Sequence, residues 1–116
     1  MATSTQWQMA REGAMRYEQI LVPAILGPAA RALVDWSAVQ SGETVLDVGC
    51  GTGVAARYAA EQAGPSGRVI GIDVNAGMID VAKSLPPVQG AAIEWHEKSA
   101  YQLPLAEQAV DVALCA

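Results

Sequence analysis

Residues 45–53 read VLDVGCGTG, an apolar run that ends in three alternating glycines. A short apolar run bounded by turn residues is typical of a β-strand that is buried on both faces. The glycines at Gly49, Gly51 and Gly53 predict a tight turn in which the backbone approaches a ligand closely. The helix-prone run VAARYAAEQA (54–63) follows. This stretch therefore predicts a strand, a glycine loop and a helix.

The same alternation continues to the end of the chain. RVIGID (68–73) predicts a second buried strand, and AGMIDVAKSL (76–85) predicts a helix that ends at two prolines. AAIEWHE (91–97) predicts a third strand and AVDVALCA (109–116) a fourth. Strands that alternate with helices through short loops indicate a parallel sheet with right-handed crossovers. We therefore expect one α/β domain.

The region before the first strand has a helical pattern. We expect residues 1–43 to form an N-terminal helical segment and residues 44–116 to form the ligand-binding core. AMRYEQILV (14–22) predicts a helix that stops near Pro23, because proline breaks the helical hydrogen-bond ladder. A second helix should begin near Pro28, since proline suits the first helical turn.

Composition and charge limit the class of protein. The 116 residues are 52% apolar and 16% charged, which suits one small domain with a buried core. The net charge of −5 and the absence of a Lys/Arg cluster disfavour a nucleic-acid partner or an anionic membrane. The apolar stretch 20–34 is too interrupted to span a bilayer, and the N-terminus does not resemble a signal peptide. We expect a cytoplasmic protein with free thiols at Cys50 and Cys115 and with no metal site.

The glycine loop predicts the chemistry of the ligand. Ligands of parallel α/β sheets bind beyond the carboxyl ends of the strands. The dinucleotide pattern G-x-G-x-x-G fails here, because its last glycine would fall on Val54 or Ala56. The carboxylate of Asp47 would repel a pyrophosphate and attract an ammonium group. This pattern favours a nucleoside ligand that carries an amine.

The second strand adds a second acid. Asp73 ends that strand, 20 residues after Gly53, and an acid in this place can accept both hydroxyls of a ribose. One carboxylate is then placed for an amine and the other for a diol. S-adenosylmethionine carries both groups and no phosphate.

Three motifs occur in the order expected of a known family. VLDVGCGTG, GIDVNAGMI (71–79) and the LPL…VDVALCA stretch (103–116) resemble the class I S-adenosylmethionine-dependent methyltransferases. They are most similar to the small-molecule group that includes the ubiquinone/menaquinone C-methyltransferases, and the likeness begins upstream at residues 16–36. The resemblance implies a Rossmann-like parallel sheet with flanking helices. Only the first four strands would be present, so the sheet would be incomplete at the edge of strand four.

The resemblance also implies where the methionine end of the cofactor lies. Cys115, at the end of the fourth strand, would approach the cofactor amine through its main chain. The remaining residues of this part come from the first strand and the loop after it: Asp47, Gly49, Cys50, Gly51 and Gly53.

The adenosine end would lie along the next two strands. Asp73 would bind the ribose hydroxyls, and Val74 and Met78 would pack near the adenine. Ser99 and Ala100 would lie at the adenine edge. Ser99 stands where the family usually has an aspartate, so the adenine amino group loses a charged acceptor. We expect this to lower affinity by about 1 kcal/mol.

Two main functions remain open. The first is transfer of a methyl group from S-adenosylmethionine to a small-molecule acceptor, with release of S-adenosylhomocysteine. Catalysis would rest on alignment and proximity, so we assign no catalytic residue. The alternative is a truncated, inactive cofactor-binding or interaction module that pairs through the exposed edge of strand four. Its partner would be a second copy or a missing C-terminal half. A dinucleotide-binding domain is disfavoured by the glycine spacing.

Several polar residues also have simpler explanations. His96 is the one histidine of the sequence and has no apparent catalytic partner, so we interpret it as a solvated strand-end residue. Tyr17 could fold over the cofactor as a lid, although packing within the N-terminal helix is the simpler interpretation. Asn75 could cap the helix that follows it, and Asp73 alone could serve as a turn residue.

Overall fold

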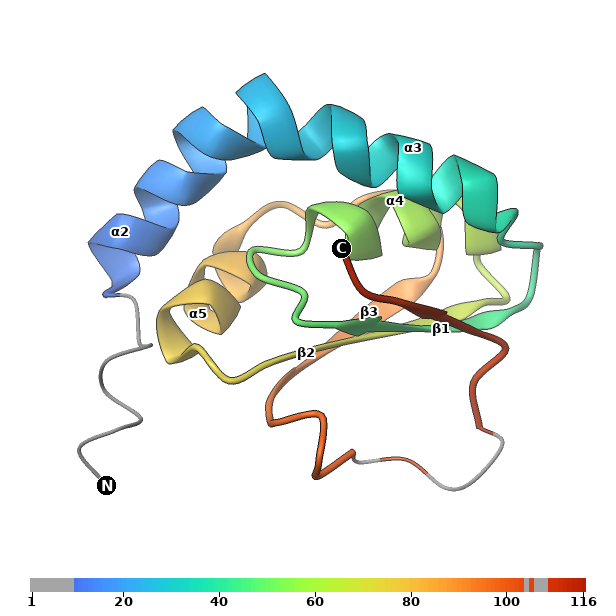
Figure 1. The fold of residues 1–116 in the computed structure, drawn as a ribbon. Coiled ribbons are helices and arrows are strands. Elements are labelled where there is room, and N and C mark those ends of the chain that lie inside the picture. Colours follow the sequence, from blue (N-terminus) through green and yellow to red (C-terminus); the bar gives the residue numbers. More distant parts are fainter. Residues whose placement is uncertain (1–9, 104, 106–108) are drawn as a thin grey trace.

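The computed structural model describes residues 10–103, 105 and 109–116. Its four strands form one parallel sheet in the order β3-β2-β1-β4 (Figure 1). The alternation of apolar strands and helices therefore produces the predicted α/β fold. The strands are β1 (Thr44–Val48), β2 (Arg68–Asp73), β3 (Ala92–Glu97) and β4 (Val112–Leu114).

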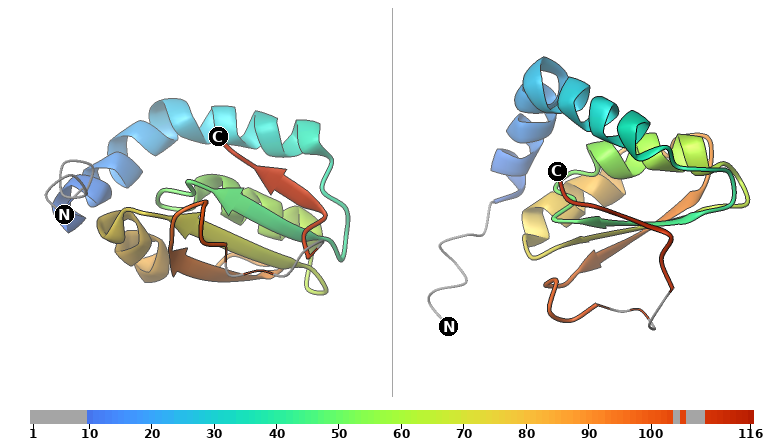
Figure 2. Two further views of the ribbon diagram at one scale, coloured as in Figure 1. Left: turned by 60° about the horizontal axis from the view of Figure 1, so that its bottom comes forward. Right: turned by 45° about the vertical axis from the view of Figure 1, so that its right-hand side comes forward.

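The helices cover one face of the sheet. Figure 2 shows them together on one side, while residues 98–103 after β3 run along the other. α2 packs against α5, and α3 packs against α4. The helical elements are α2 (Arg11–Arg16), η1 (Tyr17–Leu26), α3 (Gly27–Ser37), α4 (Val54–Ala63) and α5 (Ala76–Ser84).

The predicted break at Pro23 is wrong. The chain is continuously helical from Arg11 to Ser37, and Pro23 lies inside η1, which is a π-helix. The wider π-turn lets the N–H of Gly27 reach the carbonyl of Val22, five residues earlier. A Cβ at Gly27 would lie 2.7 Å from that carbonyl oxygen. Tertiary packing and a glycine at the end of η1 thus carry the helix past the proline.

By length and composition alone, this joined helix of 27 residues is apolar enough to cross a membrane. The expectation that its apolar stretch is too interrupted therefore does not hold for the helix as folded. In this structure its inner face is packed against the rest of the domain, with Ala14, Val22, Ala30 and Val34 buried. The helix is the outer layer over α4 and α5 (Figure 1).

The core lies on both faces of the sheet. On the helical face, Val45 and Val69 pack with a series of alanines along α4. These small side chains let α4 fit between the sheet and α3. On the other face, Leu46, Ile70 and Ile72 form a separate cluster. Burying such a side chain contributes about 1.5–3 kcal/mol, and burial on both faces accounts for the continuous apolar runs of β1 and β2.

The fourth strand is shorter than predicted. It forms three pairs with β1, from Val45↔Val112 to Asp47↔Leu114. Asp111 stands before it and bonds with Thr44: its carboxylate accepts the Thr44 N–H at 2.8 Å, and its own N–H donates to the Thr44 carbonyl at 2.9 Å. In the part of the chain that the structure describes, β4 is an edge strand that pairs only with β1. The strand order reverses between β1 and β4, which opens a crevice at their carboxyl ends.

Candidate functional site

The glycine loop joins β1 to α4 through three left-handed residues. Gly49, Gly51 and Gly53 have φ angles of +67°, +57° and +96°, a region in which side chains are strained. The loop is held against β2 because the N–H of Cys50 donates to the carbonyl of Ile72 at 2.9 Å. Among the residues that the structure describes, and apart from the two chain neighbours of Gly49, no heavy atom lies within 4 Å of the place where its Cβ would stand. A ligand can therefore approach the backbone there.

A pocket of about 330 Å³ lies between this loop and the N-terminal helix. It opens at the switch point between β1 and β4, where parallel α/β sheets bind their ligands. Four of the residues predicted from the sequence line its sheet side: Asp47, Gly49, Cys50 and Cys115. Side chains that the sequence did not indicate line the helix side, among them Leu26, Ala29 and Leu33.

Asp47 is the most unusual group in this pocket. It is 1% exposed, and its Oδ2 has no hydrogen-bond partner in the part of the chain that the structure describes. Burial raises the pKa of this carboxyl to about 7, and the charge of Asp73 adds to the rise. A hydrogen bond from the backbone N–H of Ala56 opposes it. Buried polar atoms without partners are rare in folded proteins, so this carboxyl is suited to a cationic ligand.

Cys50 lines the sheet side of the pocket and has an unreactive thiol. Its side chain is buried, and burial raises the pKa of its thiol, with further contributions from Asp47 and Asp73. The thiol therefore stays protonated at neutral pH. Cys115, by contrast, is exposed at the end of β4.

Asp73 lies at the end of β2 and is tied to its surroundings. Its Oδ2 accepts the N–H of Gly51 at 2.9 Å, and its Oδ1 accepts the N–H of Asn75 at 2.8 Å. Each carboxylate oxygen keeps capacity for a further hydrogen bond. The side chain therefore serves as the turn residue considered above and can still accept from a diol. Asn75 caps α5 by accepting the N–H of Gly77 at 3.1 Å, which confirms that alternative.

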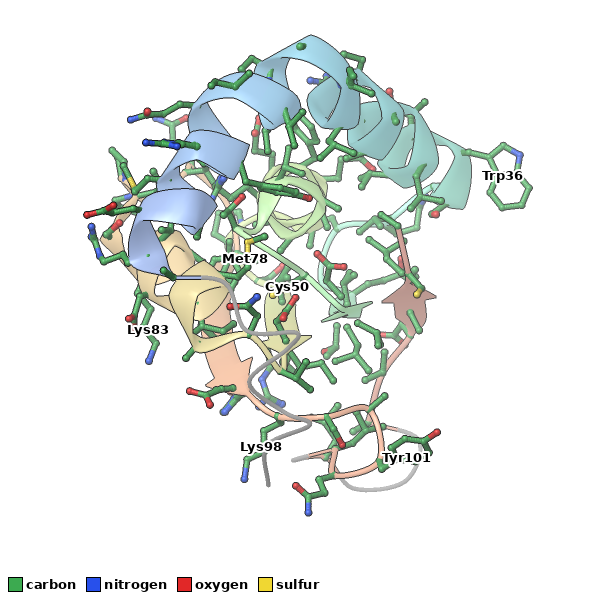
Figure 3. The ribbon with its side chains drawn as sticks, turned by 60° about the vertical axis from the view of Figure 1, so that its left-hand side comes forward. Trp36, Cys50, Met78, Lys83, Lys98 and Tyr101 are labelled. Atoms are coloured by element: carbon green, nitrogen blue, oxygen red, sulfur yellow. The ribbon has the colours of Figure 1, made fainter. Side chains whose placement is uncertain are left out.

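The two residues predicted to lie near an adenine differ in exposure. Val74 follows β2 and is 50% exposed. Met78 on α5 is 7% exposed and packs with Ala14 and Val81 beneath α2. Figure 3 shows Met78 and Cys50 in the interior of the domain.

The segment after β3 runs beside the end of β2. The N–H of Lys98 donates to the carbonyl of Asp73 at 3.0 Å, which brings Ser99 and Ala100 close to that strand end. The hydroxyl of Ser99 accepts the N–H of Tyr101 at 3.1 Å. Ala100 is exposed. Figure 3 shows Lys98 and Tyr101 away from the N-terminal helices. None of residues 98–101 lines the pocket between the glycine loop and the N-terminal helix.

Tyr17 reaches the glycine loop from η1. Its hydroxyl oxygen lies 3.6 Å from the place of a Cβ at Gly51, and its ring lines the pocket. Burial raises the pKa of this phenol, and the charges of Asp73, Glu18 and Asp47 raise it further. Tyr17 also packs against the cluster of Ala14 and Met78. Tyr17 therefore packs within the N-terminal region and also lies over the glycine loop, so it has features of both alternatives considered from the sequence.

His96 lies outside this pocket. Its Nε2 is 3.6 Å from an oxygen of Glu94, its neighbour on the same strand face. Within residues 10–103, 105 and 109–116, no group of three or more His, Cys, Asp or Glu residues is placed to hold a metal ion.

The fold and the pocket together define a class. The structure has a parallel sheet in the order 3-2-1-4, a glycine loop after β1 and an acid in or at the end of each of the first two strands, as the resemblance to S-adenosylmethionine-dependent methyltransferases implied. Residues 45–116 match a family model described as a methyltransferase domain. The chain belongs to this methyltransferase family, whose cofactor is S-adenosylmethionine.

Individual relatives agree with this assignment. The chain is 37% identical over 82 residues to the 2-phytyl-1,4-naphtoquinone methyltransferase of Nostoc punctiforme. This match covers 69% of this chain and 36% of that protein. It is 50% identical over 56 residues to the aklanonic acid methyltransferase of a Streptomyces species, covering 48% and 26% of the two chains. It therefore spans about a third or less of these relatives.

A solved structure shows the same fold. The SAM-dependent methyltransferase from Aquifex aeolicus superimposes with a TM-score of 0.70 and 24% sequence identity. The match covers 88% of this chain and 55% of that one. This likeness supports the α/β fold assigned from the strand order.

Proposed function

We propose that this chain binds S-adenosylmethionine in the pocket between the glycine loop and the N-terminal helix. In this proposal it is the cofactor-binding part of a methyltransferase that acts on a small-molecule acceptor. The observation that carries the proposal is the Oδ2 of Asp47, which has no hydrogen-bond partner among the described residues. A buried carboxyl in a ligand-sized pocket calls for a cation. The pocket volume of about 330 Å³ lies at the lower end of the range for small-ligand sites, about 300–1,000 Å³.

The residues present fit this cofactor. Asp47 would accept hydrogen bonds from its ammonium group, and the open backbone at Gly49 would admit its methionine portion. Asp73 does not line this pocket. From the end of β2 it would accept the ribose hydroxyls with the lone pairs that its two backbone partners leave free. When bound, the cofactor supplies an activated methyl group on a sulfonium. The protein then has to hold donor and acceptor in line, which is catalysis by proximity and orientation.

Two observations support a small acceptor. The naphtoquinone and aklanonic acid methyltransferases, to which the chain is similar, are named after small organic compounds. The net charge of −5 and the absence of a basic cluster do not suit a nucleic-acid acceptor. We also propose a cytoplasmic location, because the free thiols of Cys50 and Cys115 suit a reducing compartment.

Calorimetric titration with S-adenosylhomocysteine tests the proposal, with NAD as the control ligand. We expect micromolar binding of the first and none of the second. Asp47→Asn should abolish the binding because an amide presents no charge to the ammonium group. Asp80→Asn, an exposed acid on α5, should leave it unchanged.

If the wild-type chain binds neither ligand, the proposal is refuted and the interaction module takes its place. That alternative predicts dimers through the edge of β4, which light scattering would detect at high protein concentration. A monomer that binds S-adenosylhomocysteine would exclude it.

A further inference from the structure

Three side chains join the N-terminal helix to the glycine loop. Oε1 of Glu18 on η1 accepts a hydrogen bond from the hydroxyl of Thr52 at 2.7 Å and another from Nη2 of Arg57 at 3.2 Å. Nη1 of Arg57 on α4 donates to the main-chain carbonyl of Thr52 at 2.8 Å. These contacts form a closed ring between η1, the loop and α4. We call the three residues the Glu18 latch.

The latch is shielded from water. The side chains of Arg57 and Glu18 are 15% and 19% exposed, and Thr52 is 1% exposed. The ion pair of Arg31 and Asp35 on α3 is by comparison more than half exposed, at 3.6 Å. Exposed pairs contribute little, whereas removing one member of a shielded pair leaves the other charge without its partner.

The latch lies beside the proposed cofactor pocket but does not line it. Tyr17, the residue before Glu18, both lines the pocket and lies over Gly51. Leu26 and Ala29, further along the same helix, form more of the pocket wall. Thr52 stands inside the glycine loop, between Gly51 and Gly53. The latch therefore joins the two walls of the pocket without being part of its surface.

We propose that the Glu18 latch positions the pocket: it holds the helix over the glycine loop and thereby slows release of the cofactor. This inference rests on the proposed function, because it assigns a role around the same pocket. Glu18 acts through the helix and the loop, so it is a positioning residue. Glu18 is the second residue of the π-helix η1. This is consistent with the role, since π-helical turns are frequent at functional sites.

The test compares Glu18→Gln with Glu12→Gln. The second makes the same chemical change at an exposed position of α2. Affinity and dissociation rate for S-adenosylhomocysteine are measured at a temperature where circular dichroism shows every variant folded. We expect Glu18→Gln to raise the dissociation constant about tenfold, chiefly through faster release, and Glu12→Gln to change it less than about twofold.

A second pair of variants covers the case in which Glu18→Gln does not fold. Thr52→Val removes the hydroxyl at nearly constant volume, and Thr52→Ser keeps it. We expect Thr52→Val to release the ligand faster and Thr52→Ser to behave like the wild type. A lower unfolding temperature with an unchanged release rate would show that the contacts are merely structural and would overturn the inference.

Hydrogen exchange of the ligand-free protein separates this inference from the proposed function. If the latch holds the helix, amides of residues 17–26 exchange faster in Glu18→Gln than in Glu12→Gln. Equal exchange in both variants refutes the latch, whatever the ligand does. A wild type that does not bind S-adenosylhomocysteine refutes the proposed function, and with it the role of the latch in cofactor release.

Discussion

Asp47→Asn should stabilise the ligand-free protein while it removes ligand binding. The carboxyl of Asp47 is 1% exposed, and one of its oxygens has no partner in the described part of the chain. Its pKa rises from 3.8 to about 7 because burial disfavours the charged form. At about 1.4 kcal/mol per pKa unit, this difference is worth about 4 kcal/mol. An asparagine does not titrate and avoids this cost.

The sign of the effect follows from the two pKa values. Below about pH 4 the carboxyl is neutral in both the folded and the unfolded protein, and folding carries no penalty. Between about pH 4 and pH 7 the unfolded chain loses its proton first, so the wild type loses stability as the pH rises through 7. The difference between Asp47→Asn and the wild type should therefore grow by about 4 kcal/mol over this range.

Urea unfolding at pH 4.5, 6 and 8 (about these values) measures this difference, with the exposed Asp80→Asn as the control. Asp80→Asn should show no growth of the difference with pH. A gain of Asp47→Asn that does not depend on pH would contradict the titration argument. A loss of stability at pH 8 would show that the carboxylate has a stabilising partner, and the case for a cation site would fail.

Three further predictions concern the loop, the ligand and the sheet edge. Gly49→Ala, with open space around it, should cost only the strain of its positive φ, about 1–2 kcal/mol in thermal unfolding. Gly53→Ala should cost about 1–3 kcal/mol more than Gly49→Ala, because its φ is also positive and a Cβ would overlap the ring of Trp95. Equal losses would contradict the argument. Calorimetry should show that affinity for S-adenosylhomocysteine falls as the pH drops below 7, because protonated Asp47 no longer attracts an ammonium group; constant affinity from pH 5 to pH 8 (about these values) would argue against that contact. Arg68→Ala breaks the ion pair of Arg68 with Glu94 on β3. The two side chains are 48% and 41% exposed, so the change should lower the unfolding free energy by less than about 1 kcal/mol. A larger loss in urea unfolding would mean that this edge pair is stronger than its exposure indicates.

Local patterns were sufficient for the elements of the core. The bounds predicted for the helix at 54–63 and the strand at 68–73 are those of α4 and β2. Gly53 and Gly64 flank the helix, and Gly67 precedes the strand. Each element has the residue composition of its own secondary structure, so no contact with a distant residue was needed to predict it. The glycine loop was predictable for the same reason.

The course of the N-terminal helix was not predictable in this way. Proline at position 23 is a local signal for a break, but the helix continues because a π-turn removes the conflict and packing on α4 and α5 offsets the lost hydrogen bond. The length of β4 also differs from the prediction, since only Val112–Leu114 of the apolar run pairs with β1.

The residue types of the site were determined by the sequence itself: an acid before a glycine loop and a second acid at the next strand end indicate an amine and a diol. Only the tertiary structure decided that Asp47 loses contact with water, which is what raises its pKa. It also decided that Tyr17 and Glu18 cover the loop, with Glu18 bonded to Thr52 across 34 residues of chain. Burial and long-range contact depend on how separate elements pack, and no spacing within one element carries that information.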